Sequence, residues 1–252
     1  MDKLSVIIIT LNEERNIERA LKSVVEVADE IIVLDSLSTD NTEAICSKYD
    51  VRFIKEKWKG YSASKNFAND LASFDWILSL DADEELDAEM ITDVLAHKKN
   101  GFNGVYILNR LTNYCGSWIK HSGWYPDKKI RIFKKSIAKW VGEYVHEELE
   151  FSEDVAETLI KGHLNHYSYY DYKDHKQRAD KYSLLTAQKM NAAGKKAGAL
   201  KPYFSAFARF FSMYFIRAGF LDGWAGFKVA QISAKSNILK YKTLRKLNKE
   251  NG

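Results

Sequence analysis

LSVIIIT, residues 4–10 of this 252-residue chain, is the stretch that decides the fold. It is an uninterrupted run rich in β-branched residues, which is typical of a strand covered on both faces. Asn12, Glu13 and Glu14 close the run, so it is too short for the apolar core and cleavage site of a signal peptide. The stretch therefore predicts a buried strand in a parallel sheet with helices on both sides.

Three further segments of the first hundred residues have the same strand character, and helical segments separate them. The strands are EIIVLD (30–35), VRFIKE (51–56) and WILSLD (76–81), and the helical segments are residues 13–25, a short one around Ala44 and Ile45, and residues 62–71. This alternation predicts a parallel α/β sheet, whose ligands bind beyond the carboxyl ends of its strands. Polar clusters follow those ends, in residues 12–14, 35–40 and 81–85.

The second half of the chain is organised differently. GVYILNRLTNY, KKIRIFKK and YVHEELEF, between residues 104 and 151, alternate as strands do and predict antiparallel or mixed pairing. The loop CGSWIKHSGWYPDKK (115–129), with His121 and Trp124, indicates a ligand-facing surface. From residue 169 onward the pattern is helical, so we expect a domain over residues 1–168 and a helical extension over residues 169–252.

The helical extension combines aromatic and basic residues. YFSAFARFFSMYFIRAGF (203–220) has Arg209 and Arg217 as its only charged residues, and residues 195–249 contain a single acid. One interpretation is a helix packed onto the rest of the protein. The other is a helix in the membrane interface, with the basic segment 228–249 on anionic headgroups. Both stay open, and no apolar run of 18 residues predicts a spanning helix.

Composition sets broad limits. Hydrophobic residues make up 46% of the chain and charged residues 29%, which is typical of a globular protein, and the net charge of +4 says little about partners. Cys46 and Cys115 show neither a disulfide framework nor a CxxC pattern, so they fit a reduced, cytoplasmic compartment.

WILSLDADEEL (76–86) carries four acids within five residues, and three explanations fit them. One is a solvated loop, and another is a calcium loop, although the Gly and the later Glu of an EF-hand are missing. The third is a divalent cation that holds a diphosphate. Asp81 and Asp83, at i and i+2 of an extended chain, point the same way and favour the third, since Mg²⁺ and Mn²⁺ prefer few carboxylates plus phosphate oxygens. Glu84 and Glu85 are expected to flank the site or to begin the next helix.

Eight motifs along the chain carry a resemblance to a known family. They are TLNEERNIERAL, VLDSLSTDNT, SKNFAND and SLDADEE in the first half, and GSWIKHSGWYPDKKIRIFKK, WVGEYVHE, HYSYYDYKDHKQRADKYS and GFLDGWAGF in the second. With them the chain resembles the family 2 glycosyltransferases of GT-A fold over nearly its whole length. The second-half motifs are similar to the branch that builds the lipopolysaccharide core, including β-glucosyltransferases. The resemblance implies a nucleotide-sugar-binding half (1–100) and an acceptor-side half (101–168), followed by the helical extension.

The resemblance also implies roles for individual residues on the donor side. It implies nucleotide contacts for Thr10, Glu13, Asp35, Lys65 and Asp81, and a Mn²⁺ or Mg²⁺ site formed by Asp83 and His166. Lys65 stands where many relatives carry Arg, so it keeps the charge but loses the bidentate fork. His163, three residues before His166, is a rival ligand that spacing alone does not separate. Leu37 stands where the turn more usually has Gly, so it should avoid a positive φ or be strained.

The acceptor side needs a base, because an inverting displacement requires a carboxylate to take the proton of the acceptor hydroxyl. Glu147 shares a strand face with apolar neighbours and is the predicted base, while Glu148 on the opposite face is the solvated alternative. His146 would orient the base or contact the substrate, as His121 and Trp124 would on the acceptor side. Arg131 in KIRIF projects opposite to its apolar neighbours and is predicted to reach the diphosphate.

The predicted function is therefore a metal-dependent, inverting hexosyltransferase. It would move a sugar from a UDP-linked donor to a hydroxyl of a lipid-linked glycan such as the lipopolysaccharide core, as a cytoplasmic protein peripheral to the inner face of an anionic membrane. A polyprenyl-phosphate glycosyltransferase is the neighbouring alternative, and its phosphate acceptor needs no base. A pyrophosphorylase would want a glycine-rich loop where this chain has TLNEERN. A basic nucleic-acid-binding protein is disfavoured by the acidic cluster and the lack of a known module, so no nucleic-acid partner is expected.

Overall fold

In the computed structural model, which describes residues 1–142, 148–152 and 154–250, the stretch Leu4–Thr10 forms strand β1 near the middle of a mixed sheet. The sheet order is β3-β2-β1-β4-β8-β6-β12-β5. These strands are β1 (Leu4–Thr10), β2 (Glu30–Asp35), β3 (Arg52–Lys55), β4 (Trp76–Asp81), β5 (Glu84–Leu86), β6 (Val105–Tyr114), β8 (Asp127–Lys134) and β12 (Leu164–Tyr169). The four strands from β3 to β4 are parallel, and β8 is antiparallel to both β4 and β6. This arrangement confirms the predicted α/β fold class.

Four shorter strands complete the described sheets. β7 (Ser117–Ile119) and β11 (Glu157–Leu159) each pair with β6. β9 (Ala138–Val141) and β10 (Glu148–Phe151) form a separate antiparallel pair.

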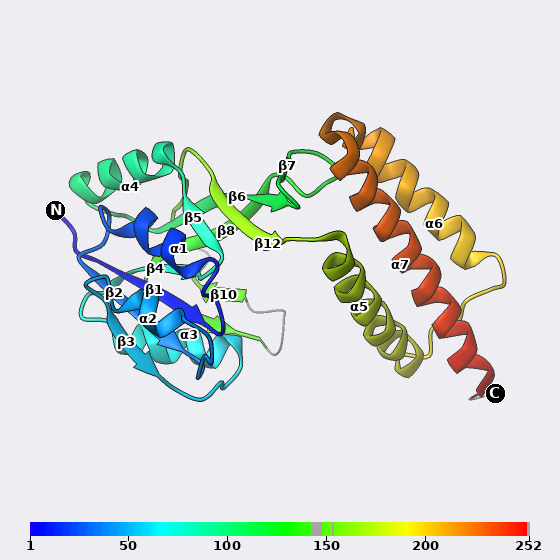
Figure 1. Cartoon of the computed structure of the whole chain (residues 1–252), viewed down its shortest axis with the longest axis horizontal. Helices are drawn as coiled ribbons and strands as arrows, with labels where there is room; N and C mark the ends of the chain where they lie inside the picture. The colour runs from blue at the N-terminus through cyan, green and yellow to red at the C-terminus, as the bar shows by residue number, and fades with distance from the viewer. Residues whose placement is uncertain (143–147, 153, 251–252) are drawn as a thin grey trace. The chain divides into compact units, whose positions relative to one another are not determined.

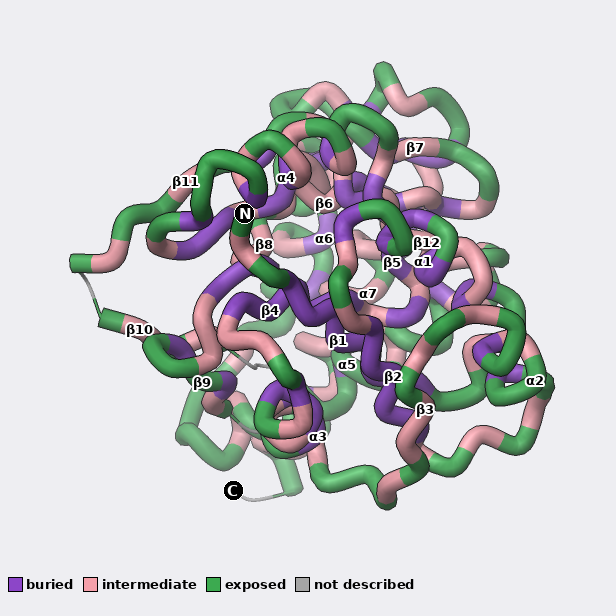
Figure 2. The backbone as a smooth tube through the Cα atoms, turned by 90° about the vertical axis from the view of Figure 1, so that its left-hand side faces the viewer, coloured by how far each residue is buried: buried purple, intermediate pink, exposed green. Residues whose placement is uncertain are grey.

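Strand β1 is buried on both faces because helices cover both sides of the sheet. The helices are α1 (Ile17–Val24), α2 (Thr42–Cys46), α3 (Tyr61–Asp70) and α4 (Ala88–Asn100). Leu4, Val6 and Ile8 belong to the core cluster that includes residues of α1 and α4, whereas Ile7 and Ile9 pack in the cluster that includes α3. Figure 2 shows β1 buried along its length, and β4 is buried up to its last residue, Asp81. Each such side chain contributes roughly 1.5–3 kcal/mol of burial free energy, so the central strands hold the site in place.

The chain divides into two units, residues 1–110 with 127–166, and residues 111–126 with 167–252. Figure 1 labels the elements of both. The sequence placed residues 111–126 in the acceptor-side half of the catalytic domain, but they group with the helices of the second unit. The domain boundary that the sequence predicts, after residue 168, lies close to the division between residues 166 and 167.

The second unit is mainly helical. Its helices are α5 (Tyr172–Ala192), α6 (Lys201–Phe211), a π-helical turn (Ser212–Ile216), a 3₁₀ turn (Gly219–Asp222) and α7 (Gly223–Glu250), and α7 packs against both α5 and α6. A Cβ at Gly226 would overlap the carbonyl oxygen of Gly219, so glycine is required where α7 crosses the 3₁₀ turn. Among the described helices, none combines the length and the apolar character that crossing a membrane requires.

Candidate active site

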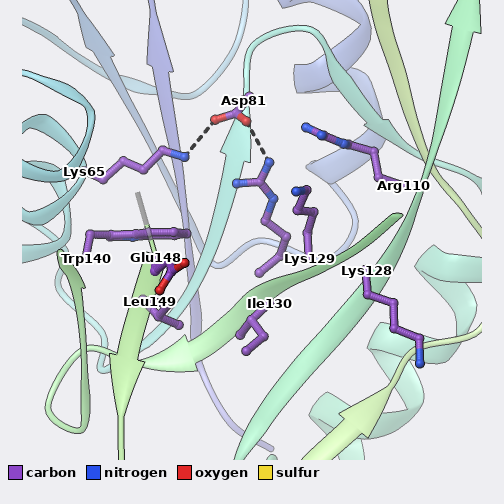
Figure 3. Close-up of a pocket in the computed structure, with 10 residues that line it drawn as sticks. Lys65, Asp81, Arg110, Lys128, Lys129, Ile130, Trp140, Glu148 and Leu149 are labelled. Carbon is purple, nitrogen blue, oxygen red and sulfur yellow. Dashed lines mark hydrogen bonds and ion pairs between the residues drawn. The ribbon is translucent and has the colours of Figure 1, made fainter. Parts of the chain in front are cut away.

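Asp81, the last residue of β4, lies between two buried cations. The Nζ atom of Lys65 on α3 is 3.1 Å from Oδ1 of Asp81, and Nη2 of Arg131 on β8 is 2.7 Å from Oδ2 (Figure 3). Burial would raise the pKa of Asp81, but the charges of Arg131 and Lys65 and their hydrogen bonds lower it overall. Asp81 is therefore held as a carboxylate at the carboxyl end of β4, where a ligand of such a sheet binds.

The contacts of Asp81 continue as an alternating series of charges, which we call the ion-pair chain. Its members are Lys65, Asp81, Arg131, Glu84, Arg110, Asp127 and Lys129. Nη2 of Arg131 is 2.6 Å from Oε1 of Glu84, and Nη2 of Arg110 is 2.7 Å from Oδ2 of Asp127. Burial would lower the pKa of Arg131, but Asp81 and Glu84 raise it overall, so the guanidinium stays charged although it is only 3% exposed.

Of the two roles predicted for Glu84, flanking the site and beginning the next helix, the structure shows the first. Glu84 lies in the short strand β5, accepts a hydrogen bond from Arg131 and is 1% exposed. Helix α4 instead begins at Ala88, and Asp87 caps it by accepting the backbone N–H of Met90. Sequence reasoning missed this role because the partner of Glu84, Arg131, comes from a strand 47 residues further along the chain.

Asp83 is brought to His166 by a turn rather than by strand alternation. Residues 82 and 83 form a turn between β4 and β5, so the predicted extended geometry of Asp81 and Asp83 is wrong. Oδ2 of Asp83 lies 3.3 Å from Nε2 of His166 on β12. The rival His163 is placed elsewhere, with Nδ1 3.1 Å from Oδ2 of Asp87 at the start of α4.

Asp83 and His166 fit a small divalent cation as two of its ligands. Carboxylate oxygen and imidazole nitrogen both bind Mn²⁺, and Mg²⁺ accepts one or two carboxylates together with water and phosphate oxygens. Within the described ranges no group of three or more His, Cys, Asp or Glu is arranged for a metal. A cation held here would therefore take most of its ligands from a bound diphosphate and from water.

The residues predicted to contact the base of the nucleotide lie at the ends of neighbouring strands. Thr10 of β1 is in register with Asp35 of β2, and both are buried. Oγ1 of Thr10 has no hydrogen-bond partner in the part of the chain that the structure describes. Asp35 accepts the backbone N–H of Ser38 at 2.9 Å, and Leu37 within that turn has a φ of +66°. Leu37 thus has the strained, positive-φ conformation that we predicted for a residue standing where this turn more usually has glycine.

Glu13 lies in the loop after β1. Its backbone N–H donates to Oγ1 of Thr42, and its carboxylate accepts from Nδ2 of Asn16 at 2.7 Å. The loops after β1 and β2 are joined further by Asn12, which accepts the N–H of Thr39 at 2.8 Å.

A pocket of about 480 Å³ opens beside the ion-pair chain, which is a volume typical of small-ligand sites. It is lined by Lys65, Asp81, Arg110, Lys128, Lys129, Ile130, Arg131, Trp140, Glu148 and Leu149 (Figure 3). The predicted base Glu147 and His146 lie outside the described residues. Glu148, the alternative to Glu147, lines the pocket, so it is a second carboxylate at the site.

His121 and Trp124 lie in the second unit. Nδ1 of His121 is 2.7 Å from Oδ1 of Asp222, and Oδ2 of the same carboxylate accepts the backbone N–H of His121. The Trp124 ring packs on Tyr114 and Tyr169, with centroids 5.5 and 5.6 Å apart. Both side chains thus have structural partners, and their acceptor-side role stays a prediction.

A parallel α/β half with charged side chains at the carboxyl ends of its strands is the architecture of proteins that bind nucleotides. The chain belongs to glycosyl transferase family 2, because the model of that family matches residues 5–148. The protein is therefore a glycosyltransferase, as the sequence predicted.

Relatives extend the similarity beyond the matched region. The chain is 32% identical to an uncharacterized glycosyltransferase of Rickettsia typhi, over 98% of this chain and 88% of the relative. It is 28% identical to the lipopolysaccharide core biosynthesis glycosyltransferase LpsC of Rhizobium meliloti, over 92% of this chain and 87% of LpsC. A crystal structure of S. aureus TarS, residues 1–349, aligns over 99% of this chain and 92% of that 1–349 chain, with a TM-score of 0.47 and 16% identity.

Proposed function

We propose that the chain is a metal-dependent, inverting glycosyltransferase that moves a sugar from a UDP-linked donor to a hydroxyl of a lipid-linked glycan, such as the lipopolysaccharide core. The observation that carries the proposal is the approach of Asp83 to His166 at 3.3 Å, directly after the strand that ends in Asp81. The similarity to LpsC, whose name assigns it to lipopolysaccharide core biosynthesis, supports the acceptor class.

The side chains at the carboxyl edge of the sheet have separate roles in donor binding. Thr10 and Asp35 contact the base of the nucleotide, and Asp81 contacts its ribose or a metal-bound water. Lys65 and Arg131 hold the Asp81 carboxylate in place. Because both cations are nearly fully buried, Asp81 needs no rearrangement when the donor binds.

Asp83 and His166 would hold the cation, which supplies neutralising charge to the leaving diphosphate when it is bound. On the other side of the donor sugar, Glu147 accepts the proton of the attacking hydroxyl. A base in this position lets the acceptor oxygen attack as its proton leaves.

Replacing Asp83 tests the proposal. We expect Asp83→Ala to abolish the Mn²⁺-dependent thermal shift caused by UDP-sugars and to lower turnover by at least about 100-fold, because one of two protein ligands is lost. His163→Ala is the matched control, since that imidazole contacts Asp87 instead. Normal metal-dependent binding and turnover in Asp83→Ala would rule out this metal site.

We also propose that the second unit binds an anionic membrane surface. Leu200, Phe204, Phe207, Phe211 and Phe215 recur at helical spacing, and each is at least 44% exposed. We call the four phenylalanines among them the aromatic stripe. A helix with an apolar face and Lys-rich surroundings lies in the headgroup region of a membrane, and twelve Lys or Arg between residues 195 and 249 provide the complementary charge.

Vesicle sedimentation tests this membrane contact. We expect the full chain to bind vesicles of phosphatidylethanolamine and phosphatidylglycerol but not of phosphatidylcholine, and Phe204→Ser/Phe207→Ser/Phe211→Ser to lose that binding. The control is Tyr182→Ser/Leu184→Ser/Leu185→Ser, which removes three exposed apolar side chains from α5. If the phenylalanine variant and the α5 variant bind the anionic vesicles equally, the aromatic stripe is not the membrane contact.

A further inference from the structure

Three cations gather on one side of the pair of helices α6 and α7 in the second unit, and we call Lys201, Arg209 and Lys240 the cation triad. The two helices pack side by side (Figure 1). The Nζ atoms of Lys201 and Lys240 lie over the same ring, 5.7 and 4.8 Å from the centroid of Tyr241. The sum of the two distances, 10.5 Å, is therefore the most that can separate the two ammonium groups.

Polar contacts between the helices connect Arg209 to this pair. Nζ of Lys240 donates to Oδ1 of Asn237 at 2.9 Å, and Nδ2 of Asn237 donates to Oγ of Ser205 at 3.0 Å. Lys201, Ser205 and Arg209 follow one another at intervals of four residues on α6, so they share one side of that helix. Lys240 thus reaches across from α7 to the middle of a row whose two ends are cations.

No carboxylate in the described part of the chain neutralises the cation triad. Between residues 195 and 249 the single acid is Asp222, and it already accepts hydrogen bonds from His121. None of the three cations forms an ion pair with a described residue. Burial, and then the like charges of the other two cations, lower the pKa of Lys240, which is partly buried. An anion held between the three would relieve this repulsion, because buried charges are normally paired.

The triad lies between the buried side of α6 and the exposed aromatic stripe. With about 3.6 residues per turn, the row from Lys201 to Arg209 is about a third of a turn from the stripe. On the other side of the row, Pro202 and Ala206 are buried. When an apolar stripe enters the acyl boundary of a membrane, cations that flank it stay at the level of the headgroup phosphates.

We propose that the cation triad is a binding site for a phosphate group, and that the aromatic stripe beside it makes a membrane lipid the source of that group. Three cations favour a phosphomonoester, which carries about −1.5 to −2 charges at pH 7, over a singly charged phosphodiester. Arg209 offers a planar fork for two phosphate oxygens, and the two lysines act as point charges. The lipid source rests on the proposed membrane contact, whereas the phosphate site does not.

The first test compares vesicles of equal surface charge. Phosphatidylcholine vesicles contain either phosphatidic acid, a phosphomonoester, or enough phosphatidylglycerol to give the same zeta potential, and sedimentation measures binding of the full chain. We expect at least about 5-fold tighter binding to phosphatidic acid, and loss of this preference in Lys240→Gln and in Arg209→Gln. Lys235→Gln is the matched control, because it removes the same charge from the exposed surface of α7.

The second test presents the same group without a membrane. Glycerol 3-phosphate is titrated against the full chain, and the side-chain NMR signal of Lys240 is followed, with glycerol as the uncharged control. A saturable shift with glycerol 3-phosphate supports the phosphate site. If that shift comes without a preference among vesicles, the source is a soluble phosphate. A preference among vesicles without the shift supports a lipid headgroup.

Two results overturn the phosphate site. One is equal binding to both kinds of vesicle together with no response to glycerol 3-phosphate. The other is a preference for phosphatidic acid that both triad variants retain, because the phosphate then binds elsewhere. The phenylalanine variant of the aromatic stripe separates this inference from the membrane contact. It should lose binding to both kinds of vesicle and keep the response of Lys240 to glycerol 3-phosphate.

Discussion

The two units bury their polar side chains in opposite ways. In the first unit the ion-pair chain places charged groups such as Arg131 and Glu84 out of contact with water, each between partners of the other sign. In the second unit His175 is buried among the rings of Tyr114, Trp124 and Tyr169, and its nearest polar contact is the Tyr114 hydroxyl, 2.6 Å from Nδ1.

This difference indicates where function resides. Buried ion pairs add little net stability, because removing two charges from water costs about as much as their attraction returns. An aromatic cluster around a neutral imidazole is ordinary packing, with favourable ring contacts. The first unit therefore carries an arrangement that packing alone does not explain, and this arrangement lies at the proposed donor site. Substitutions at the site of the first unit should lower turnover. Substitutions in the aromatic cluster of the second unit should change only the free energy of unfolding.

The largest expected effect is on catalysis. We expect Glu147→Gln to lower turnover by about 10²–10⁴-fold while donor binding is retained, because a general base contributes in that range. Glu148→Gln should retain more activity than Glu147→Gln, although Glu148 lines the pocket. Steady-state kinetics with a nucleotide-sugar donor measures both. The reverse ranking would move the role to Glu148, and full activity of Glu147→Gln would favour a phosphate acceptor, which needs no base.

The next effect is on the stability of the first unit. Arg131→Met leaves Glu84 buried and Asp81 without its closest cation, and we expect a loss of about 3–5 kcal/mol in the free energy of unfolding. Adding Glu84→Gln should recover part of that loss, because the uncompensated charge is removed. Urea denaturation at neutral pH measures both variants. No loss in Arg131→Met would mean that the ion-pair chain is not coupled as its distances suggest.

The sequence predicts the parallel half of the fold well because its signals are local. The continuous apolar run of Leu4–Thr10 and the turn after β2 each predict their own conformation, down to the strain at Leu37. The ion-pair chain could not be predicted in this way. Strand alternation shows that Arg131 points away from its apolar neighbours, but it does not show that Glu84 is the group it meets.

The proposed metal ligands and the unit boundary show the same limit. Spacing left His163 and His166 equivalent, and only the antiparallel pairing of β12 with β5 brings His166 opposite Glu84 and close to Asp83. The segment 111–126 has the composition of a ligand-facing loop. It groups with the second unit because of contacts such as the backbone hydrogen bond from Cys115 to Tyr169, which local pattern does not encode.

The folding stability of the second unit should depend on pH rather than on a bound ligand. Burial lowers the pKa of His175 from 6.5 to about 4, with a smaller raising effect of Asp174 and a lowering one of Arg178. Between these values the unfolded chain binds a proton that the folded unit does not. Stability is therefore full above about pH 6.5 and falls by up to about 3 kcal/mol as the pH drops to 4.

His175→Phe tests this account of the second unit. The ring fits the aromatic cluster but does not titrate, so this component of the pH dependence should disappear even though the Tyr114 hydrogen bond is lost. Thermal melts followed by near-ultraviolet circular dichroism, recorded from pH 7 to pH 4, give the comparison. An unchanged slope in the variant would show that other groups cause the acid sensitivity.

The smallest effect expected is at Leu37, where the first unit holds backbone strain instead of charge. A non-glycine residue at a φ of +66° is strained by about 1–2 kcal/mol, and the side chain is 49% exposed, so little packing opposes its removal. Leu37→Gly should therefore raise the melting temperature of the first unit by roughly 2–4 °C. Leu11→Gly is the matched control, because Leu11 is 50% exposed without a positive φ, and there glycine should lower stability by about 0.5–1 kcal/mol. A fall in stability of the same size in both variants would mean that the turn after β2 accommodates Leu37 without strain.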